Sequence, residues 1–343
     1  MPYEIAEPAD LDQLVAEKGV TINGSGGAKV PTVRTIEQVM NAKTYKPEMF
    51  VESLVPTPGV TLTVAPHKTG KTLFDLQIAT NVATATHVCD YYKVLKPGPT
   101  LFVEKDDPGG LASIKDVLKR SKLPLQGAPF FTVTDIDLTL GLEFGTWLEG
   151  EIVGKSLRLV VLDSYTALRS AHTHGGDLVK NEQADLTLLD QLAKKHGMAI
   201  LLIHHYSKGS ANLDWSERSA GTFAMGAATE AQIVMTRFPD LASNANERLV
   251  RIRGRHIAGT DIVLRFDPET LTFDHVLEGG AAQYYSELLQ LKTTFGTSPF
   301  SPKKLFDELG MARTTAHRLL RRLQNVDAIR KTGYGEYRLE VSL

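Results

Sequence analysis

The chain of 343 residues has a single cysteine, Cys89. One cysteine excludes an internal disulfide and any zinc site built from cysteines, and it fits a reducing cytosol. Long apolar runs are also missing, since the longest, Met198–Ile203, is far too short to cross a bilayer. The first ten residues are acidic and lack an apolar segment of the kind that directs export. These absences predict a soluble, cytoplasmic protein with no membrane partner.

An excess of charge of one sign is missing as well. The formal net charge is −2, so any signal for nucleic acid binding must be local rather than global. The chain is, in contrast, long and rich in apolar residues. A chain of 343 residues that is 42% hydrophobic buries a full α/β core and has room for a second, small domain.

One stretch, residues 61–72, organises the rest of the chain. Its apolar Leu62 and Val64 predict a buried strand, which is followed by a tight loop and by a helix over 73–80. Strand, loop and helix in this order fit the phosphate-binding motif G-x-x-x-x-G-K-[ST], with Ala65 in place of the first glycine. Alanine fits there if its φ is negative. The alternative is a chance Gly-Lys-Thr in a strand–helix turn.

This motif predicts a site for ATP and Mg2+. Backbone N–H groups and the positive end of a helix bind the phosphates, Lys71 reaches the β and γ phosphates, and the Thr72 hydroxyl holds the metal. The residues expected around the phosphates are Ala65, Pro66, His67, Lys68, Thr69, Gly70, Lys71, Thr72 and Leu73.

Carboxylates end two further apolar stretches. Glu104 and Asp106 follow the apolar residues 101–103, and either is a candidate to orient and deprotonate the attacking water. Alternation along a strand predicts that the two share one face. The alternative is a solvated loop before a helix over 111–119. Asp163, at the end of 157–162, is the candidate Walker B acid that holds Mg2+ opposite Thr72.

A histidine pair ends the strand predicted over 199–203. His204 and His205 are placed to bind the γ phosphate and to report its loss to the loop 207–221, although a backbone-satisfied histidine is the alternative. If that loop lines a pore, Lys208 and Arg218 would touch a nucleic-acid backbone.

Arginines repeat at every second residue of the strand predicted over 248–255. On a strand, Arg251, Arg253 and Arg255 would project to one side. Two interpretations remain open, a solvated strand face or an arginine finger inserted into a neighbouring subunit's ATP site.

Taken together, these motifs resemble those of RecA-like ring ATPases. Residues 65–72, 104–108, 163–164, 204–205 and 253–266 occur in the family's order, and over about 47–275 the chain is similar to RepA-type plasmid helicases and to the ATPase domain of DnaB-type replicative helicases. The resemblance implies a hexameric ring with ATP between subunits and single-stranded DNA in the channel.

The resemblance also implies residue roles. Asp106 matches the family's catalytic glutamate by position, whereas Glu104 matches it by chemistry. Arg255 matches the finger arginine, and Arg253 stands where a lysine is usual.

The C-terminal stretch 281–343 has its own character, with ten basic and six acidic side chains. Helices over 283–295, 302–309 and 314–324, followed by a hairpin over 329–339, resemble a winged helix whose third helix enters a DNA major groove. The alternative is a module that docks on a protein partner or caps the ring. The DNA-contact candidates are Thr315, Arg318, Arg321, Arg322, Lys331 and Tyr334.

The sequence thus predicts an α/β protein with three parts: an extension or linker over 1–46, a RecA-like P-loop NTPase core with a mostly parallel twisted sheet over 47–278, and a winged helix-turn-helix domain over 279–343. We expect an ATP-dependent DNA translocase or replicative helicase of a plasmid, phage or similar mobile element, which forms a homo-oligomeric ring. The alternatives are an ATP-dependent remodeller or loader that does not unwind DNA, and an ATP-gated transcription regulator.

Overall fold

The structure is a computed structural model, and it describes residues 33–41, 47–121, 123–169, 178–205, 225, 228–238, 241–242 and 245–343. The chain divides into two compact units, Met1–Lys46 and Pro47–Leu343. In the first unit the described residues form one short helix, α2 (Ile36–Asn41), none of whose side chains is buried. We assign no chemistry to it.

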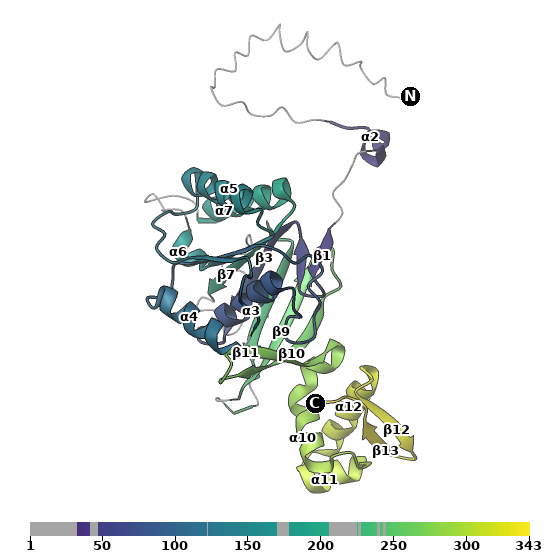
Figure 1. The fold of residues 1–343 in the computed structure, drawn as a ribbon. Helices are drawn as coiled ribbons and strands as arrows, with labels where there is room; N and C mark the ends of the chain where they lie inside the picture. Colours follow the sequence, from purple (N-terminus) through teal and green to yellow (C-terminus); the bar gives the residue numbers. More distant parts are fainter. Residues whose placement is uncertain are drawn as a thin grey trace, which may run out of the picture. The chain divides into compact units, whose positions relative to one another are not determined.

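A nine-stranded sheet forms the centre of the second unit (Figure 1). Six neighbouring strands of this sheet pair in parallel, and three further strands extend one edge in antiparallel pairing. In spatial order the strands are β5 (Phe130–Val133), β4 (Thr100–Glu104), β6 (Leu159–Asp163), β7 (Ala199–His205), β3 (Gly59–Ala65), β8 (Ala231–Arg237), β9 (Glu247–Gly254), β10 (Thr260–Asp267) and β11 (Thr272–Glu278). The expectation of a mostly parallel α/β sheet is therefore confirmed.

Helices cover both faces of the parallel part, as such sheets require. On one face α5 (Leu142–Lys155) and α7 (Leu178–His196) pack over strand residues such as Leu62 and Leu202. On the other face lie α3 (Lys71–Thr84) and α4 (Gly110–Arg120) (Figure 1). The hairpin of β1 (Glu48–Val51) and β2 (Val55–Thr57) joins the same layer as α3, and its Phe50, Val51, Leu54 and Val55 are buried in the core there.

The antiparallel strand β11 is absent from the sequence-based expectation. Gln77 of α3 holds this strand, since its Nε2 donates to the carbonyl oxygen of Phe273 at 2.9 Å and its Oε1 accepts from the N–H of Phe273 at 2.8 Å. The N-terminal half of α3, which begins at the phosphate loop, is thereby tied to the edge of the sheet 196 residues later in the chain.

Residues 279–343 form three helices and a hairpin. A 3-10 turn (Gly279–Tyr284) leads into α10 (Tyr285–Phe295), α11 (Pro302–Leu309), α12 (Arg313–Asn325), β12 (Ile329–Gly333) and β13 (Glu336–Leu339). Ser301 caps α11 by accepting from the N–H of Lys304, and Gly310 ends the helix at φ 63°. We call residues 279–343 the C-terminal module.

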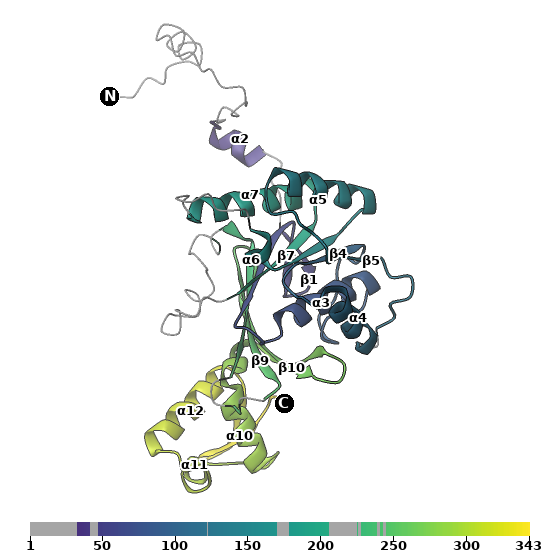
Figure 2. The same ribbon diagram turned by 90° about the vertical axis from the view of Figure 1, so that its left-hand side faces the viewer.

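The C-terminal module shares its apolar core with the sheet. The cluster contains Leu319, Leu320 and Leu323 of α12 together with Leu249 of β9 and Val263 of β10. Figure 2 shows α10 and α12 beyond the ends of β9 and β10. Because this core is continuous, the module and residues 47–278 fall in one compact unit.

Several predicted elements have different bounds in the structure. The helix predicted over 73–80 begins two residues earlier, at Lys71, because Gly70 in the left-handed region starts it directly after the loop. The strand predicted over 248–255 ends at Gly254, which leaves Arg255 in the turn that follows. Strand β4 ends at Glu104, so Asp106 lies in a loop.

Candidate active site

The phosphate loop joins β3 to α3 at the carboxyl edge of the parallel strands, where α/β sheets bind ligands. Gly70 has φ 106°, and a Cβ at this position would lie 2.7 Å from the Phe273 ring, so only glycine fits. Ala65 is not among the residues with positive φ, which meets the condition set for alanine at the first position of the motif. Lys68 does adopt a positive φ, 58°, within the loop.

Lys71 is the buried cation of the loop, with 5% of its surface exposed. Burial lowers the pKa of its ammonium group, and this effect is opposed by Asp163, Asp106, Asp75 and Glu104. The four carboxyl groups thus surround a single lysine. A polyanion such as a triphosphate would add negative charge beside Lys71 and so stabilise the positive charge that burial disfavours.

Thr72 and Asp163 meet across the site. The Thr72 hydroxyl donates to Asp163 Oδ2 at 2.5 Å, although the two residues are 91 positions apart. Asp163 is 2% exposed, and burial raises the pKa of its carboxyl group. A hydroxyl and a carboxylate oxygen at the end of a phosphate loop are the hard oxygen ligands that Mg2+ takes, so these two residues fit that ion.

Glu104 and Asp106 do not share one face, contrary to the sequence-based expectation. Glu104 ends β4 and pairs in register with Asp163 of β6, and it is 3% exposed. Its Oε1 accepts from the N–H groups of Asp106 and Asp107 at 2.7 and 2.9 Å. The chain turns at this point, and the side chain of Asp106 is 44% exposed. The correction follows from the turn, because alternation applies only while the chain is extended.

His205 lies between the loop and Asp106. Its Nε2 is 2.8 Å from Asp106 Oδ2, and its ring stacks on that of His67 with centroids 4.4 Å apart. Burial lowers the pKa of His205, with the hydrogen bond to Asp106 opposing. Three predicted site residues from three separate stretches are therefore in contact.

His204 points to the opposite side of β7 from His205. Its ring contacts Tyr165 edge-on at 5.6 Å, and the Tyr165 hydroxyl donates to Asp185 at 3.1 Å. Burial lowers the pKa of His204 to about 4, and its Nδ1 has no hydrogen-bond partner among the described residues. The two histidines thus occupy different environments, and His205 is the one that contacts the carboxylate beside the phosphate loop.

Three residues that the sequence-based analysis missed also belong to this site. Asp75 lies one helical turn after Lys71 and is fully buried; burial raises the pKa of its carboxyl group well above its usual range, and Thr63 donates to it at 3.1 Å. Arg237 and Arg248 donate to carbonyl oxygens of the phosphate loop. The spacing of Asp75 from Lys71 was a signal in the sequence. The two arginines carry none, since they lie 169 and 179 residues from the carbonyl groups that they bind.

The predicted arginine series is divided in the structure. Arg251 and Arg253 lie on one face of β9 and reach Asp261 of β10 at 3.8 and 2.7 Å. Arg255 follows the strand and is exposed in a turn, so it does not continue the face as the sequence predicted.

The nucleic-acid candidates fall into two groups. Lys208 and Arg218 lie outside the described residues. Thr315, Arg318, Arg321 and Arg322 are exposed on α12, Lys331 is exposed on β12, and Tyr334 at the hairpin tip is fully exposed. Within the described ranges, no helix is long and apolar enough to span a membrane.

Comparison with known proteins gives one family. The AAA domain family matches residues 28–211, which is more than half of the chain. No curated protein matches the sequence. Among solved structures, the RadB recombinase is 16% identical, covers 64% of this chain and 92% of its own, and has a TM-score of 0.47. A second solved structure, described as an ATPase domain, is 11% identical, covers 64% of this chain and 85% of its own, and has a TM-score of 0.49.

The buried pair Glu104 and Asp163 predicts a pH dependence of stability. Burial, with Asp163 adding to it, raises the pKa of Glu104 to about 7 from 4.5. The folded state therefore binds more protons than the unfolded state. The contribution of Glu104 to stability is full below pH 4.5 and is lost as pH rises through about 7. Glutamine cannot lose a proton. In urea unfolding, Glu104→Gln should gain on the order of 1 to 3 kcal/mol relative to the unsubstituted chain between about pH 5 and pH 8.

Burial lowers the pKa of His204, so this residue makes stability depend on pH in the opposite sense. It is present in both chains, and its effect cancels when their free energies of unfolding are compared. Glu308→Gln, on an exposed residue of α11, is the matched control and should leave the pH dependence unchanged. An identical pH dependence in the Glu104 variant would show that this carboxyl is not protonated by burial.

Proposed function

The chain belongs to the AAA domain family, and from that premise we propose that it is an ATPase that moves along DNA, a ring helicase of a plasmid, phage or similar mobile element. The observation that carries the proposal is the meeting of Lys71, Thr72 and Asp163 at the end of the phosphate loop, with Asp106 and His205 beside them. One cation, two metal ligands and one accessible carboxylate are the groups that phosphoryl transfer to water requires.

The binding step uses the loop and its lysine. The backbone of 66–70 and the N-terminus of α3 receive the phosphates, and Lys71 neutralises them from a nearly dry position. The Thr72 hydroxyl and Asp163 would hold Mg2+, whose charge stabilises the phosphoryl oxygens. Asp163 reaches that position because β6 lies two strands from β3 in the same parallel sheet.

The catalytic step assigns different roles to the two candidate bases. Asp106 is the general base, because its carboxylate is accessible and is oriented by His205. Glu104 shapes the turn that carries Asp106, since its Oε1 already accepts two backbone N–H groups. His205 contacts both Asp106 and the loop residue His67, so loss of the γ phosphate would shift His205, the last residue of β7.

In a ring, a neighbouring subunit would supply a further positive charge to the ATP site. Arg255 lies in an exposed turn after β9, where a neighbouring subunit's ATP site would receive it as an arginine finger. Arg253, held by Asp261, supports that turn. In this arrangement a homohexamer carries single-stranded DNA in its channel, with Lys208 and Arg218 as the candidate DNA contacts.

A nucleotide-gated DNA-binding regulator is the second candidate function, and the exposed face of α12 favours it. Ala316, Leu319, Leu320 and Leu323 are buried, which leaves Thr315, Arg318, Arg321 and Arg322 exposed on α12. In the helicase proposal the same face docks the ring at a duplex origin.

Substitution of Lys71 tests the motor. Lys71→Ala removes the cation of the phosphate loop, so steady-state phosphate release should fall to background, a loss of at least about a hundredfold. Lys119→Ala, an exposed lysine of α4, is the control and should leave the rate unchanged. Unchanged turnover in Lys71→Ala would remove the motor hypothesis.

The same assay separates the candidate functions when single-stranded DNA and a forked duplex are added. A helicase shows DNA-stimulated turnover and strand separation. A remodeller or loader shows stimulation without strand separation. A regulator shows negligible turnover and sequence-specific duplex binding.

Mixing of two inactive variants tests the shared site. Arg255→Ala should lose most ATP hydrolysis while its own Lys71 stays intact. When it is mixed with Lys71→Ala, a fraction of interfaces pairs an intact Lys71 with an intact Arg255, and phosphate release should recover to a fraction of the unsubstituted rate. Recovery fails if Arg255 acts within its own subunit, and the finger assignment then falls.

The α12 face predicts salt-dependent duplex binding. In Arg318→Ala/Arg321→Ala two phosphate contacts are lost, so the slope of log K against log salt concentration should decrease by about two. Fluorescence anisotropy of a labelled duplex measures the slope. Lys303→Ala, exposed on α11, serves as the control for loss of a charge elsewhere in the module. Equal affinity and slope in all three chains would mean that α12 docks on something other than DNA.

A further inference from the structure

Two arginines of the neighbouring strands β8 and β9 hold the phosphate loop. Arg248 Nε donates to the carbonyl oxygen of Thr69 at 2.9 Å, and Arg237 donates to that of Lys68 at 2.9 Å. Arg237 and Arg248 face each other directly across the β8–β9 pair. Two consecutive carbonyl groups of the loop are therefore bound by one cross-strand pair.

Arg237 and Arg248 place two positive charges opposite each other on neighbouring strands. Like charges directly opposite each other destabilise a strand pair. Arg248 is also 5% exposed, and burial, with Arg237 adding to it, lowers the pKa of its guanidinium to about 10. A buried cation persists where its donors are satisfied. Arg248 meets this need with three carbonyl oxygens, those of Thr69, Ala245 and Glu247.

The residues that follow the two arginines belong to the opposite face of the sheet. Phe238 and Leu249 come directly after Arg237 and Arg248, and both lie in the apolar core shared with the C-terminal module. The Phe238 ring is 5.3 Å from that of Tyr285, at the start of α10. The same two short backbone segments thus contact the phosphate loop on one face and the module on the other.

A polar route runs beside this apolar one. The Tyr285 hydroxyl accepts from Arg265 at 3.3 Å, and Arg265 Nε donates to Glu247 Oε1 at 3.1 Å. Arg248 in turn donates to the backbone carbonyl of Glu247 at 2.9 Å. A short chain of polar contacts therefore links Tyr285 to the arginine that binds the carbonyl of Thr69.

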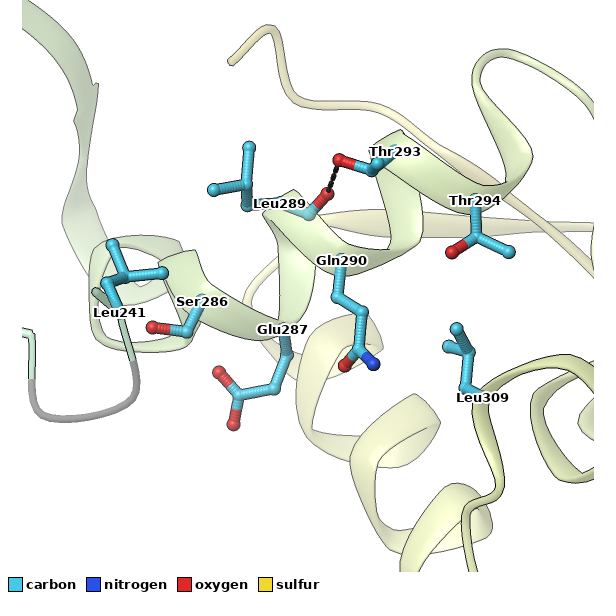
Figure 3. Close-up of a pocket in the computed structure, with 8 residues that line it drawn as sticks. All are labelled: Leu241, Ser286, Glu287, Leu289, Gln290, Thr293, Thr294 and Leu309. Atoms are coloured by element: carbon cyan, nitrogen blue, oxygen red, sulfur yellow. Dashed lines mark hydrogen bonds between the residues drawn. The ribbon is translucent and has the colours of Figure 1, made fainter. Parts of the chain in front are cut away.

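An open groove of about 560 Å³ runs along α10 from Ser286 to Thr294 (Figure 3). Figure 3 shows Leu241, from the connection after β8, near Ser286 at one end of the lining, with Leu309 at the other end. The connection between the two arginine-bearing strands thus reaches α10 directly.

We propose that Arg237 and Arg248 are positioning residues of the phosphate loop, and that they couple the packing of the C-terminal module to nucleotide affinity. This inference rests on the proposed function, in that the loop binds a nucleotide. While α10 stays packed on the sheet, the two arginines hold the carbonyl groups of Lys68 and Thr69 in place. The loop then has less conformational freedom left to lose when a nucleotide binds. Loosening of α10 weakens nucleotide binding, and by reciprocity a bound nucleotide tightens α10.

Tyr285→Phe tests the coupling in the full chain. It removes only the hydroxyl that accepts from Arg265, at a site in the module rather than in the phosphate loop. The dissociation constant for ADP with Mg2+, measured by titration of a fluorescent ADP analogue, should rise about three- to tenfold. Tyr337→Phe removes a hydroxyl from a tyrosine of β13 in the same module and should leave the constant unchanged.

Arg248→Lys provides the second half of the test. It keeps the positive charge but cannot bridge all three carbonyl groups, so ADP binding should weaken while kcat changes less than KM. Adding Tyr285→Phe to Arg248→Lys should produce no further loss, because the route is already interrupted. Equal and additive losses in the double variant would overturn the coupling.

Hydrogen exchange on the unsubstituted chain keeps the inference testable if a variant misfolds. Addition of ADP with Mg2+ should slow amide exchange in 285–295 as well as in the phosphate loop. Slower exchange in the loop alone would overturn the inference and leave the proposed function intact. Absence of any ADP binding by the unsubstituted chain would instead overturn the proposed function.

Discussion

The hydrogen bond between Thr72 and Asp163 is the contact on which the site depends. It joins the first turn of α3 to the tip of β6, and it does so beside the buried Lys71. A lysine at 5% exposure is stable only with negative charge nearby, and four carboxyl groups supply that charge. The parallel sheet places the tips of β4, β6 and β7 at one edge, and the charged residues gather there for that reason.

Different strands of the sheet supply the charged side chains and the contacts to the loop backbone. The parallel strands place Glu104, Asp163 and His205 near the phosphate loop, and Arg237 of β8 and Arg248 of β9 hold the loop by its backbone. Phe273 of β11 completes this support, because it lies against Gly70 and is bound by Gln77. The backbone of the loop is therefore supported by three strands on one side of β3.

Much of this could be predicted from the sequence, and the reason differs from element to element. Strands that end in Asp163 and His205 are apolar runs with polar tips, and the phosphate loop has fixed spacing, so local pattern located them. Asp106 was placed on the wrong face because nothing local shows that the strand ends at Glu104. Arg237, Arg248 and β11 were missed because their roles come from contacts between distant parts of the chain. Periodicity and motif spacing do not encode such contacts.

Those distant contacts set the order in which the site can form. The loop at 66–70 is held by residues as late as Arg248 and Phe273, and β3 itself pairs with β8. Long-range pairings of this kind close late in folding, since the intervening chain must be ordered first. During synthesis from the N-terminus, a nascent chain that ends before Phe273 has its lysine and threonine in place but lacks the supports of the loop. The full set of contacts around the phosphate loop is therefore present only once the chain has been made through Phe273.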